Sequence, residues 1–157
     1  MATTYSMRHE HGNIFLDGPS TSAVLRTGTL RLKRAEIEAG GGSLPIEITD
    51  RRRREARAGT EKKPVLQLSP KDSFVPGKGR VRWEVKMRFK GYRGVVSQGA
   101  DRIEVFLPRF GRTPECTVVG HWDQVETVTL AACFVLMNRR RRDGAIAAAA
   151  SSGGSGS

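Results

Sequence analysis

Apolar and polar residues alternate without a break across residues 80–90, RVRWEVKMRFK. A period of two places successive side chains on opposite faces of a β-strand. We therefore expect a strand with one buried face and one basic, solvent-facing side. The side chains expected to face the core are Val81, Trp83, Val85, Met87 and Phe89.

Seven further segments have the length and composition of strands: 13–16, 24–33, 44–49, 65–68, 102–107, 116–122 and 125–137. Glycine and proline separate them at short intervals, as is typical of turns between antiparallel strands. Residues 91–94, GYRG, are interpreted as the hairpin connection after residues 80–90. We predict an all-β, mainly antiparallel domain of about eight short strands, either a jelly-roll-like β-sandwich or a barrel.

Two segments fit a helix as well as a strand. Residues 32–39 precede three glycines, and glycine commonly follows the C-terminus of a helix, so a short helix is an alternative there. Residues 125–137 are apolar on both faces, which fits a central strand or a buried helix. The β-branched residues Val125, Thr127, Val128 and Thr129 favour the strand.

The composition divides the chain into three parts. Residues 1–12 are expected to form a flexible N-terminal segment, and residues 13–142 the basic β-rich domain. Within that domain, residues 50–63 are nearly all charged or small, which indicates an exposed loop or a mobile insertion. Residues 143–157 consist mainly of alanine, serine and glycine and are expected to be disordered, or at most a frayed helix.

Positive charge is concentrated in one segment. The formal net charge is +11, and residues 51–112 contain 18 Lys and Arg against 6 Asp and Glu, whereas the rest of the chain contains 9 against 10. An excess of this size attracts polyanions. Nucleic acid, RNA or DNA, is therefore the expected partner. Because only 6% of residues are aromatic, binding should depend on phosphate contacts and show weak sequence specificity.

Two arginine runs, residues 51–54 and 139–142, are the densest charges. Clustered guanidinium groups bind phosphates through paired hydrogen bonds, and such runs also fit a nuclear import signal. Solvated loops are the alternative interpretation. With the outward face of residues 80–90 included, the predicted nucleic-acid-binding residues are Arg51, Arg52, Arg53, Arg54, Arg80, Arg82, Lys86, Arg88, Lys90, Tyr92 and Arg93.

Few aromatic residues are candidates for base stacking. Those expected in loops are Tyr92, Phe110, Phe74 and Trp122. Residues 90–97 match the octapeptide of RNA-recognition motifs at some positions but lack two of its aromatics, and no flanking helices are predicted, so that family is excluded.

No residue pattern indicates an enzyme, a metal or a cofactor. A zinc site drawn from His9, His11, Cys116, His121 and Cys133 would lack the usual paired ligand spacing. Both cysteines are expected to be reduced and to face the core. With no long apolar run and no signal-like N-terminus, we expect an intracellular protein with no membrane partner.

Two other function classes fit the composition. The strand pattern also suits a structural subunit that assembles into a homo-oligomer, such as a small capsid-like jelly roll. An adaptor that acts through protein contacts is the third hypothesis.

Overall fold

A computed structural model describes residues 2–18, 22–27, 33–60, 62–110 and 113–155 of the chain. These residues form twelve strands and a single helix. The elements are β1 (Ala2–Glu10), β2 (Asn13–Asp17), β3 (Ser22–Arg26), β4 (Arg34–Ala39), β5 (Gly42–Ile48), β6 (Ala56–Gly59), β7 (Pro64–Leu68), β8 (Ser73–Val75), β9 (Gly79–Arg88), β10 (Gly91–Gln98), β11 (Asp101–Pro108), β12 (Glu115–Val119) and α1 (Val125–Ser155).

The twelve strands form one closed antiparallel barrel. Each strand pairs with the next along the chain, and β12 returns to pair with β1. The expected all-β, antiparallel class is confirmed. Of the two expected architectures the barrel is observed, with twelve strands instead of about eight. The sandwich is wrong, because closure into a barrel leaves neither of the two separate sheets that a sandwich has. The strand order is also sequential, without the Greek-key crossing of a jelly roll.

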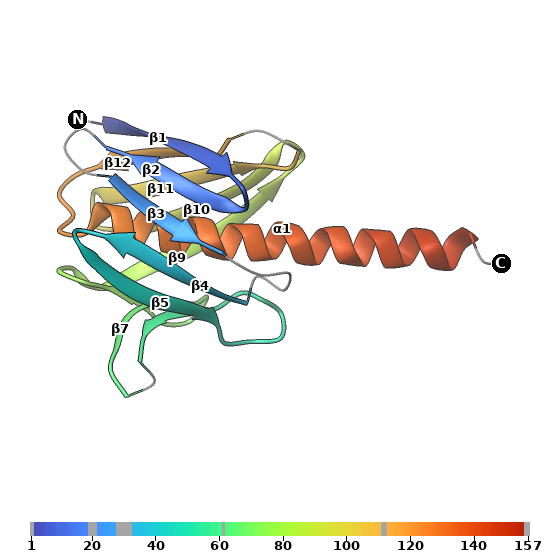
Figure 1. Cartoon of the computed structure of the whole chain (residues 1–157), viewed down its shortest axis with the longest axis horizontal. Helices are drawn as coiled ribbons and strands as arrows, with labels where there is room; N and C mark the ends of the chain where they lie inside the picture. Colours follow the sequence, from blue (N-terminus) through green and yellow to red (C-terminus); the bar gives the residue numbers. More distant parts are fainter. Residues whose placement is uncertain (1, 19–21, 28–32, 61, 111–112, 156–157) are drawn as a thin grey trace.

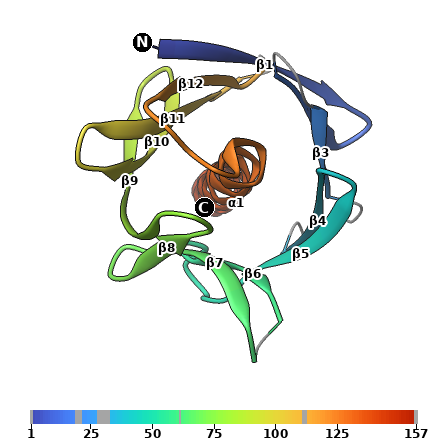
Figure 2. The ribbon, with the colours of Figure 1, turned by 90° about the vertical axis from the view of Figure 1, so that its left-hand side faces the viewer.

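Helix α1 runs through the middle of the barrel (Figure 2). Its N-terminal part lies inside the barrel, and its C-terminal part projects beyond one end (Figure 1). Every residue from 127 to 138 is buried. Side chains just fill the interior of an eight-stranded barrel, so twelve strands leave a wider lumen. A helix about 10 Å across fills that space.

The strand expected at residues 125–137 is therefore wrong. A helix surrounded on all sides must be apolar on all sides, so it shows no amphipathic period. Burial within the barrel outweighs the strand preference of the β-branched residues. The wall and the helix approach closely at Gly94, where a Cβ atom would lie 2.5 Å from Trp83 Cη2 and 3.3 Å from Leu136 Cδ2.

Several local expectations are also corrected. Residues 34–39 form β4 rather than a helix, and the N-terminal segment expected to be flexible contains β1. The expected loop at residues 50–63 contains β6, whose Ala56 and Ala58 side chains are fully buried. The hairpin turn lies at Phe89 and Lys90, so residues 91–98 form β10 instead of a connection.

The C-terminal part of the chain also differs from expectation. Residues 143–155, expected to be disordered or at most a frayed helix, continue α1 to Ser155. The strand expected at residues 116–122 ends at Val119. Of the strand expected at residues 24–33, the structure shows β3 up to Arg26, and residues 28–32 lie outside the described part. No helix among the described residues combines the length and apolar character required to span a bilayer.

Candidate nucleic-acid interface

The two arginine runs meet at the end of the barrel where α1 emerges. The Arg53 side chain donates from Nη1 to Asn138 Oδ1 at 3.3 Å. The Arg142 side chain donates from Nη1 to the Arg52 carbonyl oxygen, also at 3.3 Å. Asn138 is fully buried, and its Nδ2 donates to the Phe134 carbonyl at 3.0 Å. The helix thus carries the second run through the barrel to the first.

The first run is held in a tight turn between β5 and β6. Oδ1 of Asp50 accepts hydrogen bonds from the backbone N–H groups of Arg54 at 2.9 Å and Glu55 at 3.0 Å. Asp commonly folds a turn around its own side chain in this way. Arg53 takes a left-handed conformation with φ of 55°. Because Asp50 is occupied by backbone donors, the exposed guanidinium groups of this turn are left for other partners.

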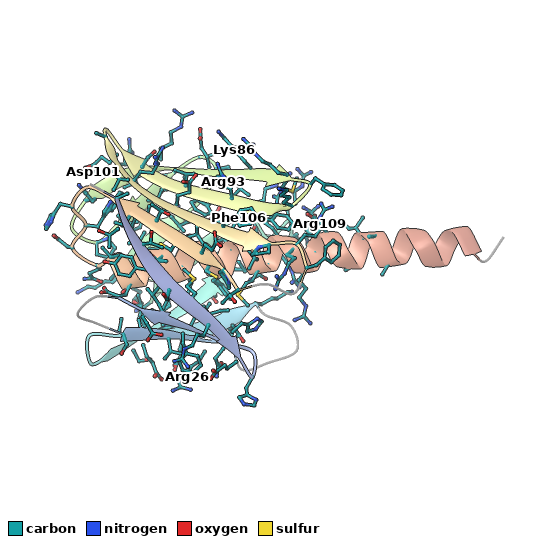
Figure 3. The ribbon with its side chains drawn as sticks, turned by 90° about the horizontal axis from the view of Figure 1, so that it is seen from above. Arg26, Lys86, Arg93, Asp101, Phe106 and Arg109 are labelled. Carbon is teal, nitrogen blue, oxygen red and sulfur yellow. The ribbon has the colours of Figure 1, made fainter. Side chains whose placement is uncertain are left out.

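Three more cations lie at the same end. Arg88 ends β9, Lys90 lies in the β9–β10 turn, and Arg109 follows β11. The Arg109 N–H donates to the Lys90 carbonyl at 3.0 Å and joins the two turns. In Figure 3, Arg109 lies where α1 leaves the barrel, and Asp101 lies at the opposite end.

We name this group of ten arginines and one lysine the arginine mouth. Its members are Arg51, Arg52, Arg53, Arg54, Arg88, Lys90, Arg109, Arg139, Arg140, Arg141 and Arg142.

The cations of the arginine mouth and those on the outer face of β9 and β10, here called the sheet face, differ in whether they form ion pairs with carboxylates. Within the described residues, no ion pair joins a mouth cation to a carboxylate. On the sheet face, by contrast, three of the predicted binding residues are paired. These ion pairs are Arg80–Asp72 at 3.7 Å, Arg82–Glu84 at 2.6 Å and Arg93–Glu104 at 3.3 Å. The positive charge of the face is therefore partly neutralised, and that of the mouth is not.

The alternation along β9 holds only in its first part. Trp83 is buried and Val81 and Val85 are half-buried, as expected, but Met87 is 53% exposed and Phe89 is 89% exposed. These last two residues stand at the rim of the barrel, where side chains are exposed to solvent instead of facing the core. Arg139 Nη2 lies 3.5 Å from the Met87 sulfur.

Lys86 projects outward and pairs in register with Arg93 of β10. Figure 3 shows these two side chains on the same outer face. Lys86 is exposed, and no ion pair to it occurs among the described residues. In being exposed and without an ion pair among the described residues, Lys86 resembles the mouth cations more than the other sheet-face residues do.

Tyr92, predicted as a binding residue, is not available at the surface. Its ring is fully buried, and its hydroxyl donates to Asp143 Oδ2 at 2.7 Å. Burial, followed by the hydrogen bond to Asp143, raises the pKa of the Tyr92 phenol. The residue anchors α1 to β10 just beyond the second arginine run. Of the other stacking candidates, Trp122 is buried and Phe74 half-buried, whereas Phe110 is 81% exposed.

A pocket leads from the mouth along the barrel wall. Strand β8 pairs with β9 only from Gly79 to Val81, so residues 82–88 have no strand neighbour on that side. The pocket there has a volume of about 550 Å³, and the charged residues that line it are Arg54, Lys86, Arg139 and Glu84. Nε of Arg139 is buried and has no hydrogen-bond partner within the described residues. A bound water or ion commonly satisfies such a buried polar atom.

The cysteines are placed for packing. Cys116 and Cys133 are buried and unpaired, as expected. Burial raises their pKa values to about 11 and about 12, so both thiols are protonated at neutral pH and poorly nucleophilic. His121 is exposed and lies 3.3 Å from Asp123. Among the described residues, no three His, Cys, Asp or Glu side chains cluster as metal ligands would.

The sequence-predicted site is thus divided by the structure. Residues 51–54, Arg88 and Lys90 lie in the mouth, whereas Arg80, Arg82 and Arg93 lie on the ion-paired face. Arg109 was not predicted, and residues 139–142 were considered as a phosphate-binding run but left out of the predicted binding residues. One sequence feature could have identified residues 139–142 as part of the site. They directly follow an apolar stretch long enough for a helix, and a charged run in that position marks where a buried helix reaches solvent.

In comparisons with protein-family models, curated proteins and solved structures, no significant match to this chain is found.

Proposed function

We propose that this chain is a non-enzymatic nucleic-acid-binding protein that holds the phosphate backbone in the arginine mouth. The observation that carries the proposal is the convergence of two arginine runs, distant in sequence, around the emerging helix. Guanidinium groups present paired donors that match phosphate oxygens. A cluster of cations without acidic partners also concentrates a positive potential that attracts polyanions.

The mouth supports this role better than the outer face of β9. A phosphate that binds Arg80, Arg82 or Arg93 must compete with a carboxylate that is already in contact. A phosphate at the mouth meets cations that form no ion pair among the described residues, so it has no such competitor. Because these contacts address phosphates and not base edges, the proposed binding has weak sequence specificity.

Two variants with equal charge loss test the proposal. The mouth variant combines Arg51→Gln, Arg88→Gln and Arg141→Gln, three exposed residues from three elements of the mouth. The face variant combines Arg80→Gln, Arg82→Gln and Arg93→Gln. Affinity for a labelled single strand and a labelled duplex is measured by fluorescence anisotropy over a range of salt concentrations.

The mouth variant should bind more weakly and flatten the slope of log affinity against log salt. The expected change is about 2 for a single strand and about 3 for a duplex, from roughly 0.7 and 0.9 per lost phosphate contact. The face variant should keep most of the slope. The opposite pattern, with the face variant losing the slope and the mouth variant keeping it, would show that the outer sheet is the binding surface.

A further inference from the structure

Two phenylalanine side chains at the mouth are exposed to solvent. Phe89 is 89% exposed in the β9–β10 turn, and Phe110 is 81% exposed just after β11. Exposed apolar side chains that gather in one patch are typical of an interaction site, whereas scattered single ones are ordinary. Most of the large hydrophobic side chains that are exposed among the described residues gather at this end, namely Met87, Phe89, Phe110 and Ile146.

The two rings belong to neighbouring turns. Strands β10 and β11 pair in register from Gly91 and Pro108, and the hydrogen bond from Arg109 to Lys90 continues this ladder by one step. Phe89 adjoins Lys90 in the β9–β10 turn and Phe110 adjoins Arg109, so this hydrogen bond holds together the two turns that carry the rings. Cations flank both rings, because Phe89 lies between Arg88 and Lys90, and Phe110 follows Arg109. Apolar rings and positive charges therefore occupy the same end of the barrel.

We propose that the ligand of the mouth is single-stranded nucleic acid, whose bases stack on Phe89 and Phe110 while its phosphates bind the surrounding cations. This inference rests on the proposed function and specifies its substrate. A duplex hides the faces of its bases, whereas a single strand presents them, and stacking on aromatic rings tolerates any base. The prevalence of arginine over lysine at the mouth favours the same ligand, since guanidinium planes bind phosphates and also stack on bases.

The test separates base stacking from phosphate binding. The affinity of the full chain is measured for oligo(dT), for an abasic strand of equal length and charge, and for a duplex. The same measurements are made on the double variant Phe89→Ala with Phe110→Ala. Val65→Ala is the matched control, because Val65 is an exposed apolar residue on β7, away from the mouth.

The native chain should prefer oligo(dT) over the abasic strand by about 30-fold or more, the lower end expected for two stacked bases. The double variant should lose this preference and bind the abasic strand as the native chain does. Val65→Ala should leave every affinity unchanged. Circular dichroism and thermal unfolding verify that the double variant is folded.

Two results would overturn the inference. Equal affinity for oligo(dT) and the abasic strand, with the salt dependence retained, would leave the proposed function intact and show that stacking is absent. Binding to vesicles of phosphatidylcholine and phosphatidylserine that requires both phenylalanines, with oligo(dT) affinity unaffected by their loss, would identify a lipid surface as the partner of the rings. If the mouth variant leaves all oligonucleotide binding unchanged, the proposed function itself fails.

Discussion

A helix threaded through the barrel predicts that consecutive residues of α1 are all essential to stability. Phe134, Val135 and Leu136 are each completely buried. Had this segment formed a strand in the barrel wall, alternate side chains would face outward, and their truncation would cost little. Single substitutions by alanine at three successive positions therefore distinguish the two arrangements.

The expected losses follow from the size of each buried side chain. Phe134→Ala should reduce the free energy of unfolding by about 3–5 kcal/mol, and Leu136→Ala by about 2–5 kcal/mol. Val135→Ala removes two buried methyl groups and should cost about 2 kcal/mol, from roughly 0.8 kcal/mol per carbon and a cavity contribution. Ile146→Ala lies on the same helix outside the barrel, where the side chain is 54% exposed. It should change stability by no more than about 0.5 kcal/mol.

Equilibrium unfolding in urea measures these differences, with the fluorescence of the buried Trp83 and Trp122 as the signal. The midpoint should fall for the three core variants while the denaturant slope stays constant. An alternating result, in which Val135→Ala is neutral and its two neighbours are costly, would refute the threaded helix. A loss at Ile146 as large as that at Leu136 would refute it as well.

Three further predictions concern the junction of the arginine runs and the titrating groups. Asn138→Ala removes the acceptor of Arg53 from a buried position and should lower the free energy of unfolding by about 1–3 kcal/mol in urea titrations. Burial raises the pKa values of Cys116 and Cys133 from the ordinary 9.0 to about 11 and about 12. The stability that this contributes is present below pH 9 and should be lost as the pH rises through these values. Replacing both cysteines by alanine should flatten this loss in unfolding experiments across that range. Burial, and after it a nearby guanidinium, lowers the pKa of His9 below 6.5, so stability should decrease as the pH falls below 6.5, and an NMR titration should show this pKa rise when a polyanion binds.

The sequence predicted the sheet best where one side of a strand faces water and the other faces the core. Residues 80–85 show this, because Arg82 and Trp83 alternate between solvent and the barrel interior. The alternation of apolar and polar residues gave the wrong burial where the strand extends beyond the core. Met87 and Phe89 continue the alternation in sequence, but they lie at the rim and are exposed.

The helix was missed for a different physical reason. A segment enclosed on all sides has no polar face, so neither helical nor strand periodicity can appear in it. Its length was the better indicator, because an uninterrupted apolar run of this kind exceeds the usual five or six residues of a strand. Without that helix, residues 139–142 could not be placed beside residues 51–54, and the predicted binding site combined residues 51–54 with the outward face of residues 80–90.

The central claim is that the two arginine runs form one binding surface, and the most direct measurement observes the guanidinium groups themselves. The Nε–Hε signals of the arginines are assigned by NMR and followed as oligo(dT) is added at constant salt. Signals from residues 51–54 and 139–142 should shift together and saturate at the same ligand concentration, while those of Arg80, Arg82 and Arg93 should stay nearly constant. Shifts confined to these three sheet-face arginines, or a response from only one of the two runs, would contradict the account.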